Sequence, residues 1–322
     1  MTATPERRDR QPLERDAHAD PSAAFNPEHD IAWIHQRVTD WFVHHGRDLP
    51  WRHADCSPWG IFVSEIMAQQ TPIARIEAPW REWMTRWPTP AHLAAAAPGD
   101  AVRLWGRLGY PRRALRLHDA ARAMVERHGG EVPDTVDELL ALPGVGAYTA
   151  AAVACFAYAV PAPVVDTNVR RVLARAHAQA APSLTADERA RAAAWLPADP
   201  AQACVWNVAV MELGALVCTA RSPSCHDCPV APRCRWLGAG RPAYEGPHRP
   251  KQTYAGTDRQ ARGVLLAGVR DRADRRERDL PSLGRSGAEP PSPGDAARRR
   301  PPRARPRREH SPAALTPKHS AD

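Results

Sequence analysis

Four cysteines near the end of the apolar part of the chain constrain its fold more than any other feature. Cys218, Cys225, Cys228 and Cys234 form a C-x6-C-x2-C-x5-C array within seventeen residues. Four thiolates so close in sequence, with prolines between them, predict a compact loop around one metal centre. Zinc sites and iron–sulfur clusters both use four cysteines, so the ligand type leaves both open. A redox-active CxxC pair is less favoured, because the pair does not follow a β-α-β pattern.

The chain before this loop has the periodicity of helices. Ile31, Ile34, Val38, Trp41 and Phe42 recur at helical spacing and indicate an amphipathic helix. Further helical segments follow, separated by breaks that contain proline and glycine, and strand alternation is nearly absent. We therefore predict an all-α fold of many short helices.

The two ends of the chain differ from this helical region. Residues 1–28 have almost no large apolar side chains and residues 270–322 contain no Phe, Trp or Tyr, so we expect both to be disordered. Residues 246–269 are predicted to be a linker in which Val264 to Val269 form a short strand. Of the formal charge of +8, residues 270–322 contribute +6, from 14 Lys and Arg against 8 Asp and Glu. Overall charge is therefore poor evidence for a nucleic-acid partner.

Membrane insertion and export are not predicted. No apolar stretch approaches the roughly 20 residues that span a bilayer, and the polar start of the chain lacks the apolar core of a signal peptide. The cytoplasm is the expected compartment, where cysteines are more often ligands or free thiols than disulfides. Cys56, Cys155 and Cys204 have no companions at metal-binding spacing, and we expect them to be core or surface thiols.

Leu142, Pro143, Gly144, Val145 and Gly146 join two helical segments. A Gly-x-Gly between helices lets the backbone turn tightly and approach a ligand. It also points amide N–H groups at a helix N-terminus towards an anion. The structural alternative is an ordinary turn between two helices.

Two carboxylates, Asp166 and Glu65, are candidate catalytic groups. Asp166 lies just before a helix, where the structural alternative is an N-cap. Glu65 lies on a helix among apolar residues, and its structural alternative is a solvated helix face. A carboxyl group on an apolar surface is partly desolvated, which raises its pKa and favours the protonated acid.

These motifs together resemble one superfamily of DNA repair enzymes. The cysteine spacing closely resembles the [4Fe–4S] loop of the endonuclease III and adenine glycosylase superfamily. Leu142 to Gly146, followed by Ala147 to Ala150, resembles its helix-hairpin-helix. Ser64 to Thr71, which reads Ser-Glu-Ile-Met-Ala-Gln-Gln-Thr, resembles the signature of the adenine DNA glycosylase (MutY) family. The resemblance covers about residues 31–253 and favours iron–sulfur over zinc.

The resemblance implies a two-lobed helix-hairpin-helix glycosylase fold with a [4Fe–4S] cluster loop. The catalytic domain would occupy residues 29–245. Its six-helix lobe would take about residues 57–162, and its iron–sulfur lobe residues 29–56 together with residues 163–240.

Two bound groups and a DNA partner are implied as well. A [4Fe–4S] cluster on the four cysteines would be structural and hold a loop whose basic residues reach DNA phosphate, with Arg221, Arg233 and Arg235 as the candidates. Carbonyl groups of the hairpin would hold a monovalent cation that bridges to phosphate, a contact that positions the duplex without reading its sequence. The implied partner is double-stranded DNA, and we expect a monomer.

The resemblance to the adenine glycosylase family implies catalytic roles for four residues of this chain. Glu65 would be the acid that protonates the departing purine, and Asp166 would stabilise or transiently bond the oxocarbenium-like sugar, with Asn168 orienting it. One acid and one carboxylate beside a scissile bond is the logic of glycoside hydrolysis. Tyr148 stands where strand-cutting members of the superfamily carry a Schiff-base lysine, so water is the implied nucleophile.

The target base must leave the stack before it can be excised. The resemblance assigns its extrusion and its pocket to further residues: Trp51, Arg52, Gln69, Gln70, Thr71 and Tyr110. The two glutamines would enter the gap, and the tyrosine would be a wedge beside the opposing base. The tryptophan offers the flipped adenine a stacking face, and the arginine offers it hydrogen-bond donors. A tyrosine packed under a turn and a tryptophan in the core are the structural alternatives.

The predicted function is a monofunctional DNA glycosylase of base excision repair that removes adenine mispaired with 8-oxoguanine or guanine. A thymine–guanine mismatch glycosylase of the same superfamily and a non-catalytic iron–sulfur DNA-binding protein are the alternatives. Glu65 followed by Gln69, Gln70 and Thr71 favours adenine. The expected location is the cytoplasm, in association with the nucleoid. Many adenine glycosylases recognise 8-oxoguanine through a β-rich C-terminal domain, which nothing after Arg270 is expected to build.

Overall fold

The computed structural model describes residues 27–176, 186–243 and 256–279. Within these ranges it contains helices and turns but no strand, so the predicted all-α class is confirmed. Of the segments expected to be disordered, residues 1–26 and 280–322 lie outside the described residues, as do residues 246–255 of the expected linker. Residues 27 and 28, also expected to be disordered, begin a helix instead. No helix in the described ranges is long and apolar enough to cross a membrane.

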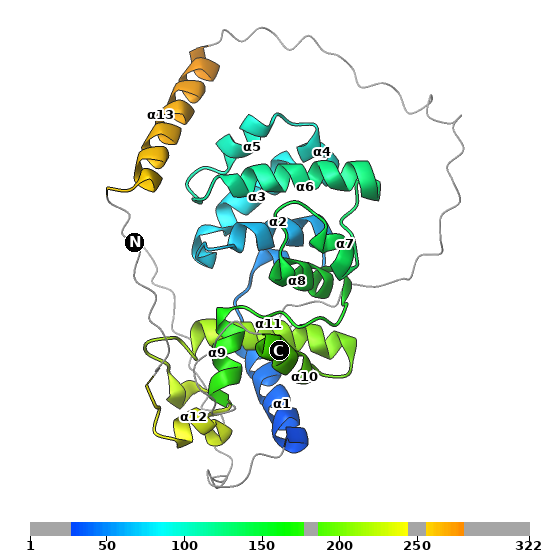
Figure 1. Cartoon of the computed structure of the whole chain (residues 1–322), viewed down its shortest axis with the longest axis vertical. Helices are drawn as coiled ribbons and strands as arrows, with labels where there is room; N and C mark the ends of the chain where they lie inside the picture. The colour runs from blue at the N-terminus through cyan, green and yellow to red at the C-terminus, as the bar shows by residue number, and fades with distance from the viewer. Residues whose placement is uncertain (1–26, 177–185, 244–255, 280–322) are drawn as a thin grey trace, which may run out of the picture. The chain divides into compact units, whose positions relative to one another are not determined.

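One lobe, the upper one in Figure 1, contains the helices α2 to α8. They are α2 (Pro58–Ala68), α3 (Glu77–Arg86), α4 (Pro90–Ala94), α5 (Pro98–Leu104), α6 (Arg112–His128), α7 (Val136–Leu140) and α8 (Ala147–Tyr158), with a short 3-10 helix η2 (Ile73–Arg75) before α3. Helix α2 contacts α3, α6 and α8, and α6 contacts α4 and α5. Trp83 and Trp105 pack edge to face in the core, with ring centroids 5.6 Å apart.

The other lobe contains the first helix and the helices that follow α8. They are α1 (Pro27–His45), α9 (Thr167–Ala176), α10 (Ala186–Ala194), α11 (Pro200–Leu216) and α12 (Arg235–Gly238), with two 3-10 helices, η3 (Cys225–Asp227) and η4 (Ala231–Arg233), in the cysteine loop. Asp199 caps α11 by accepting a hydrogen bond from the Gln202 amide at 2.8 Å. Helix α11 is apolar on nearly all sides and packs against both α1 and α9, which buries it in the centre of this lobe.

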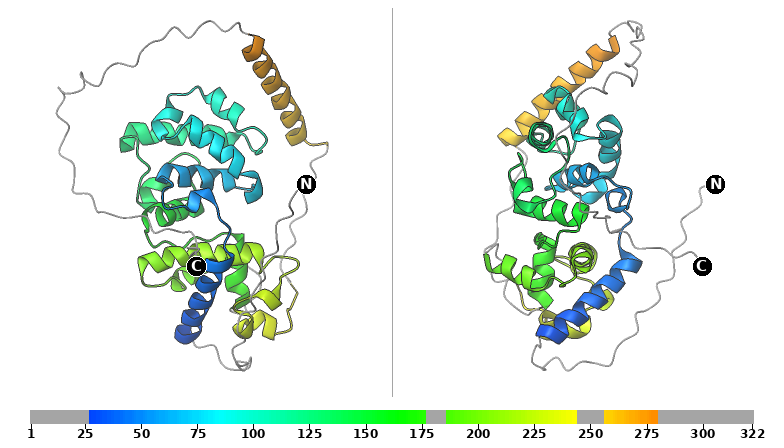
Figure 2. Two further views of the ribbon diagram at one scale, coloured as in Figure 1. Left: turned by 180° about the vertical axis from the view of Figure 1, so that it is seen from behind. Right: turned by 90° about the vertical axis from the view of Figure 1, so that its right-hand side faces the viewer.

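The chain crosses between the two lobes twice, as Figures 1 and 2 show. The first crossing follows α1 and contains the 3-10 helix η1 (Pro50–Arg52). The second runs from the end of α8 at Tyr158 to the start of α9 at Thr167. Arg52 lies on the first crossing and Asp166 on the second, so both residues lie at the junction of the lobes.

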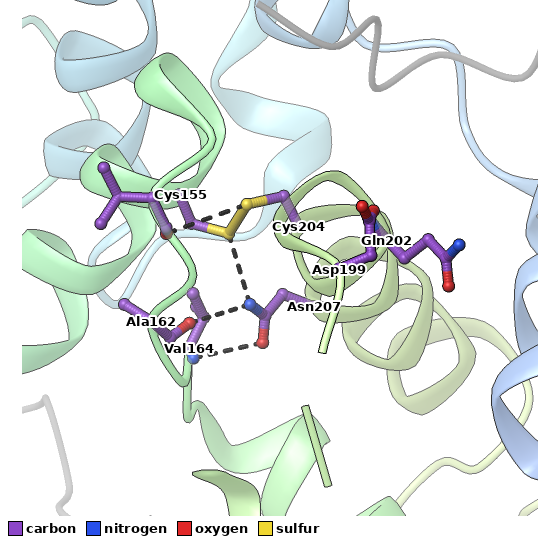
Figure 3. The surroundings of a disulfide bond; sticks show 8 residues. Cys155, Ala162, Val164, Asp199, Gln202, Cys204 and Asn207 are labelled. Carbon is purple, nitrogen blue, oxygen red and sulfur yellow. Dashed lines mark hydrogen bonds between the residues drawn. A yellow bond between two sulfur atoms is a disulfide. The ribbon is translucent and has the colours of Figure 1, made fainter. Parts of the chain in front are cut away.

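A disulfide joins the lobes near the second crossing. Figure 3 shows Cys155 of α8 paired with Cys204 of α11, and their Cα atoms lie 5.5 Å apart. Both side chains are buried, as expected for core thiols, but the expectation that they are separate is wrong. The pairing depends on the packing of α8 against α11, and a separation of 49 residues gives no local signal of it. Asn207 binds the same segment, accepting from the Val164 amide at 3.2 Å and donating to the Ala162 carbonyl at 2.9 Å.

Residues 247–309 form a separate compact unit, of which α13 (Asp258–Asp279) is described. The strand expected over residues 264–269 is wrong, because these residues lie inside this helix, which also extends into the tail expected to be disordered. Thr257 accepts a hydrogen bond from the Gln260 amide at 3.4 Å, and Gln260 Oε1 accepts one from the Gly256 amide at 2.8 Å. This reciprocal cap starts a helix, and the flanking Arg, Ala and Asp residues continue it.

Candidate active site

Glu65 lies near the end of α2, on a helix that is buried for most of its length. Ser57 caps the start of α2 by accepting a hydrogen bond from the Gly60 amide at 3.1 Å. The Glu65 side chain is only 8% exposed, and its Oε2 has no hydrogen-bond partner among the residues that the structure describes. Burial raises its pKa to about 7, although the hydroxyl of Tyr148 and the charge of Arg52 act in the opposite direction. The pKa rise predicted from its apolar neighbours is confirmed.

Asp166 lies at the start of α9, where the backbone and Asn168 hold both of its oxygens. The amides of Asn168 and Val169 donate to Oδ1 at 2.8 and 2.7 Å, and Asn168 Nδ2 donates to Oδ2 at 2.8 Å. Burial raises the pKa of Asp166, while these hydrogen bonds and the charge of Arg171 lower it. The N-cap geometry and a fixed orientation of the candidate catalytic carboxylate therefore coexist at one residue.

Tyr148, in the first turn of α8, lies beside both carboxylates. Burial raises the pKa of its hydroxyl well above the usual value, and Glu65 and Asp166 raise it further. The hydroxyl therefore stays protonated, and it contacts Met211 Sδ of α11 at 3.7 Å. The charge of Asp166 raises the pKa of Glu65, which places the two carboxylates within electrostatic reach of each other. The structure thus brings Glu65, Asp166 and Tyr148 together from α2, α8 and α9.

Glu212 of α11 belongs to the same region, and the sequence reasoning missed it. It is 1% exposed and accepts from Arg47 Nε at 2.6 Å, from Arg47 Nη2 at 2.9 Å and from Arg52 Nη2 at 2.8 Å. Burial would raise its pKa, but these arginines outweigh burial and lower the pKa to about 2. The signal was a lone acidic residue in a long apolar helix, because a buried charge needs a partner.

Trp51 and Arg52 both have partners within the protein. Trp51 is buried and packs edge-on against Trp80, with ring centroids 5.7 Å apart, as in the core alternative. Arg52 is bound to Glu212, and its Nη1 donates to the Arg47 carbonyl at 3.1 Å. The structure therefore shows Arg52 as the partner of one buried carboxylate and as a positive charge near the other, Glu65.

The hairpin between α7 and α8 is a tight turn. The Val145 amide donates to the Leu142 carbonyl at 3.2 Å, and Gly144 has φ +81°, with Pro143 before it. Proline followed by a left-handed glycine is typical of a type II turn. A Cβ at Gly144 would lie 2.7 Å from Arg116 Cβ, so the site excludes larger residues. Gly146 is exposed as the N-cap of α8, which leaves the first amides of that helix open to an anion.

Two loops of the same lobe carry the residues predicted to enter the duplex. The insertion loop, residues 69–71, has Gln70 exposed with φ +55°, and Gln69 Nε2 donates to Thr149 Oγ1 at 3.2 Å. Thr71 is buried at the base of this loop. The wedge loop, residues 108–110, ends in Tyr110, which is 39% exposed and has φ +46°. Exposure of Gln70 and Tyr110 agrees with insertion into DNA.

The four cysteines line one cavity at the end of the second lobe. Apolar side chains of α9, α11 and the loop surround them, together with Arg175 and Trp236. Arg175 Nη1 donates to Cys218 Sγ at 3.3 Å, and its guanidinium stacks on Trp236 at 4.3 Å. Without a metal, burial raises the pKa of Cys228 to about 12, so binding a cluster must displace protons. Four thiols that line one apolar cavity, with one arginine donor beside them, are the ligand type of an iron–sulfur cluster.

The three arginines predicted to reach phosphate separate into two groups. Arg221 and Arg235 are exposed at the ends of the cysteine loop. Arg233 is instead bound within the protein, 3.0 Å from Asp30 Oδ1 and stacked on Trp33 at 4.5 Å. The prediction that Arg233 is available for phosphate is therefore not supported.

Arg171 connects the cysteine loop to Asp166. Its Nε donates to the Cys218 carbonyl at 2.6 Å, and its Nη2 donates to the Gly214 carbonyl at 2.6 Å and to Asn168 Oδ1 at 2.7 Å. Asn168 in turn holds Asp166. The first cysteine of the loop is thus two side chains away from the candidate catalytic carboxylate.

Two family descriptions match parts of the chain. Residues 63–197 match the HhH-GPD superfamily of base excision DNA repair proteins. Residues 218–234, which run from the first cysteine of the array to the last, match the iron–sulfur binding domain of endonuclease III. The second match decides for iron–sulfur over zinc.

Curated relatives carry one name across distant organisms. The chain is 55% identical to a protein named adenine DNA glycosylase from Mycolicibacterium smegmatis, over 73% of this chain and 79% of that protein. It is 54% identical to the protein of that name from Mycobacterium tuberculosis, over 70% of this chain and 75% of that protein. The human protein of that name is 40% identical over 66% of this chain, which spans 40% of the human length.

Solved structures share the architecture. A thermostable thymine-DNA glycosylase superposes with a TM-score of 0.60 and 25% identity, over 64% of this chain and 96% of that one. Endonuclease III in a non-covalent DNA complex superposes with a TM-score of 0.59 and 23% identity, over 68% of this chain and 99% of that one. The predicted helix-hairpin-helix glycosylase fold is confirmed.

Proposed function

Because the chain belongs to the adenine DNA glycosylase family, we propose that it excises adenine mispaired with guanine or 8-oxoguanine from double-stranded DNA and leaves the strand intact. It is a DNA N-glycosylase of base excision repair, and thus a hydrolase. The observation that carries the proposal is the pair of carboxylates, buried Glu65 and half-buried Asp166, with the Tyr148 hydroxyl beside both.

Glu65 supplies the proton. A pKa of about 7 leaves a large fraction of Glu65 protonated at neutral pH, and a protonated carboxyl can donate to a ring nitrogen of adenine. The glycosidic electron pair then leaves with a neutral base rather than with an anion. Glu65 becomes a carboxylate and is restored by accepting a proton from the water that attacks the sugar.

Asp166 supplies the negative charge. Cleavage leaves a positive, oxocarbenium-like sugar, which the fixed carboxylate of Asp166 stabilises or transiently bonds. Asn168 and two backbone amides hold Asp166 in one orientation, so little reorganisation is needed during the reaction. Tyr148 cannot form an imine with the sugar, which supports water as the final nucleophile and an uncut strand.

DNA contacts follow from the exposed parts of the first lobe. The amides at the start of α8 and a monovalent cation on the hairpin carbonyls would bind phosphate, while Gln70 and Tyr110 enter the duplex. A [4Fe–4S] cluster on the four cysteines would have a structural role, holding Arg221 and Arg235 in their loop. We expect a monomer associated with the nucleoid in the cytoplasm.

The test is a labelled-duplex assay with adenine opposite 8-oxoguanine, guanine, thymine or cytosine, with and without alkali. We expect adenine release opposite 8-oxoguanine and guanine, with strand breaks only after alkali. Absence of adenine release from every duplex would refute the enzyme assignment, and breaks without alkali would refute the monofunctional mechanism.

The same assay distinguishes the alternatives. With a thymine–guanine duplex added to the set, release of thymine opposite guanine without adenine release would establish the thymine–guanine alternative; one structural neighbour is a thymine-DNA glycosylase. Adenine release that survives both Glu65→Gln and Asp166→Asn would show that neither carboxylate is catalytic. The 55% identity to an adenine DNA glycosylase, against 25% to the thymine enzyme, favours adenine.

A further inference from the structure

Arg113 connects the insertion loop and the wedge loop. It lies in the first turn of α6 and is 6% exposed. Its Nη1 donates to the carbonyls of Ile66 at 3.1 Å and Met67 at 2.9 Å, and also to the Gln69 carbonyl. Its Nη2 donates to Thr71 Oγ1 at 2.8 Å and to the carbonyls of Leu108 at 3.2 Å and Gly109 at 3.1 Å. One guanidinium thus binds both loops and the end of α2.

Two of the carbonyls that Arg113 binds directly precede residues with positive φ angles. Gln69 and Gly109 each directly precede a non-glycine residue in the left-handed region, namely Gln70 at φ +55° and Tyr110 at φ +46°. Such residues seldom adopt this conformation, and they keep it only where the surroundings over-determine it. Arg113 binds the peptide group before each of them, so it helps to hold both conformations at once.

The stacking partners of Arg113 belong to the same region. Its guanidinium carbon lies 5.1 Å from the ring centre of Trp105 and 5.7 Å from that of Tyr110. Burial lowers the pKa of Arg113 to about 10, which still leaves the side chain charged at neutral pH. Its planar fork serves acceptors on two sides, an arrangement that the single ammonium group of a lysine cannot reproduce.

We propose that Arg113 is a positioning residue for base extrusion, which fixes the insertion loop to the wedge loop so that Gln70 and Tyr110 enter the duplex together. This inference rests on the proposed adenine-excising function. It assigns no contact with the reacting atoms to Arg113. Glu65 lies one turn before the insertion loop on α2, and substitution of Arg113 is expected to leave the surroundings of its carboxyl unchanged.

The experiment measures extrusion apart from chemistry. A duplex carries 2-aminopurine in place of the target adenine opposite guanine, and the full-length protein carries Glu65→Gln so that no base is released. Fluorescence rises when the 2-aminopurine leaves the stack. At saturating protein, we expect Arg113→Lys in this background to abolish most of the rise, while Arg122→Lys leaves it unchanged. Arg122 lies on the same helix, is exposed and pairs with nearby Glu126 at 3.2 Å.

Adenine release by the single variants gives a second readout. We expect Arg113→Lys to slow single-turnover release on the order of 30-fold, as a small misplacement of the loops can. The pH at which the rate falls should stay that of the wild type, because Glu65 is unchanged. An unchanged fluorescence rise in the Arg113→Lys protein, or a shifted pH profile, would overturn the positioning role.

If the Arg113→Lys protein does not fold, Thr71→Val replaces it in the fluorescence experiment. It removes the one side-chain acceptor, which lies 2.8 Å from Nη2, and leaves the arginine in place. We expect about a twofold smaller fluorescence rise, in line with the loss of one charged hydrogen bond among several; an unchanged rise would overturn the proposal. A fluorescence rise in the Glu65→Gln parent, together with no adenine release by the wild-type protein, would refute the proposed function alone. No rise in the Glu65→Gln parent would refute extrusion and this inference together.

Discussion

Two buried glutamates on opposite sides of the lobe junction have opposite acid–base properties. Glu65 of α2 has its pKa raised to about 7, and Glu212 of α11 has its pKa lowered to about 2. Arg52 interacts with both. Burial acts on both carboxyls in the same direction, so burial does not explain the difference.

The hydrogen-bond donors decide the difference. Glu212 accepts from two guanidinium groups and from the Arg47 amide at 3.0 Å, which favours its charged form. Glu65 has one neutral hydroxyl donor, Tyr148, and one oxygen without a partner in the described residues, and the charge of Asp166 repels its anion. Glu212 is therefore ionised at neutral pH, whereas a large fraction of Glu65 remains protonated.

The largest expected effect is on catalysis at the Glu65 pocket. Glu65→Gln keeps the shape of the side chain but has no acidic proton, so we expect single-turnover adenine release to fall about 1000-fold, within the usual range for general acid catalysis. Urea unfolding should show no loss of stability, since the amide avoids a buried charge. The exposed Glu126→Gln is the matched control, and comparable loss in both variants would contradict the role of Glu65.

The Glu212 pocket should respond in stability instead. Glu212→Gln leaves Arg47 and Arg52 near a buried neutral amide, so we expect a loss of about 3 kcal/mol in the free energy of unfolding. Urea titration followed by circular dichroism measures it, with Glu82→Gln on the protein surface as the control. An unchanged unfolding midpoint would show that solvent reaches this cluster.

The pH dependence separates the two pockets further. Release requires protonated Glu65, so we expect the rate to fall about tenfold per pH unit above pH 7. The folded pKa of Glu65 is raised, so its contribution to stability is full below about pH 4.5 and is lost as the pH rises through 7. The folded pKa of Glu212 is lowered, so its contribution is present above about pH 4.5 and is lost as the pH falls through 2.

Unfolding titrations across this pH range provide the measurement. Glu65→Gln should remove the stability loss between pH 4.5 and 7, whereas Glu212→Gln should leave that loss in place. The same loss in both proteins would assign the titration to another group.

The smallest expected effect concerns how the second lobe holds Asp166. Arg171→Met removes the link from the Cys218 carbonyl to Asn168, so we expect release to slow about fivefold, the scale of one hydrogen bond. Arg170→Met is the control, because Arg170 pairs with Glu188 at 2.7 Å on the same helix. Iron content and visible absorbance should be retained, and loss of the cluster in the variant would show that Arg171 supports the loop rather than Asp166.

Sequence reasoning succeeded where the determining contacts are local. The spacing of the four cysteines, the tight turn at Gly144 and the cap that Asp166 forms each depend on residues a few positions apart. The pKa direction of Glu65 followed from apolar neighbours on its own helix. Helical periodicity gave the all-α class for the same reason.

The failures have a different physical origin. The pairing of Cys155 with Cys204 and the contact of Arg52 with Glu212 join residues 49 and 160 positions apart, so no local pattern indicated either. The strand expected over residues 264–269 depended on an apolar run of a few residues, which a helix accommodates equally well once its start is capped.

The sequence by itself determined the kind of loop, the hairpin and the chemical types of the candidate catalytic groups, because these depend on residues separated by less than the length of one helix. Only the tertiary structure decided which glutamate holds a proton, which cysteines pair and how Arg113 joins two loops. Those properties depend on donors and neighbours from other helices, which the packing of α2, α8, α9 and α11 brings together.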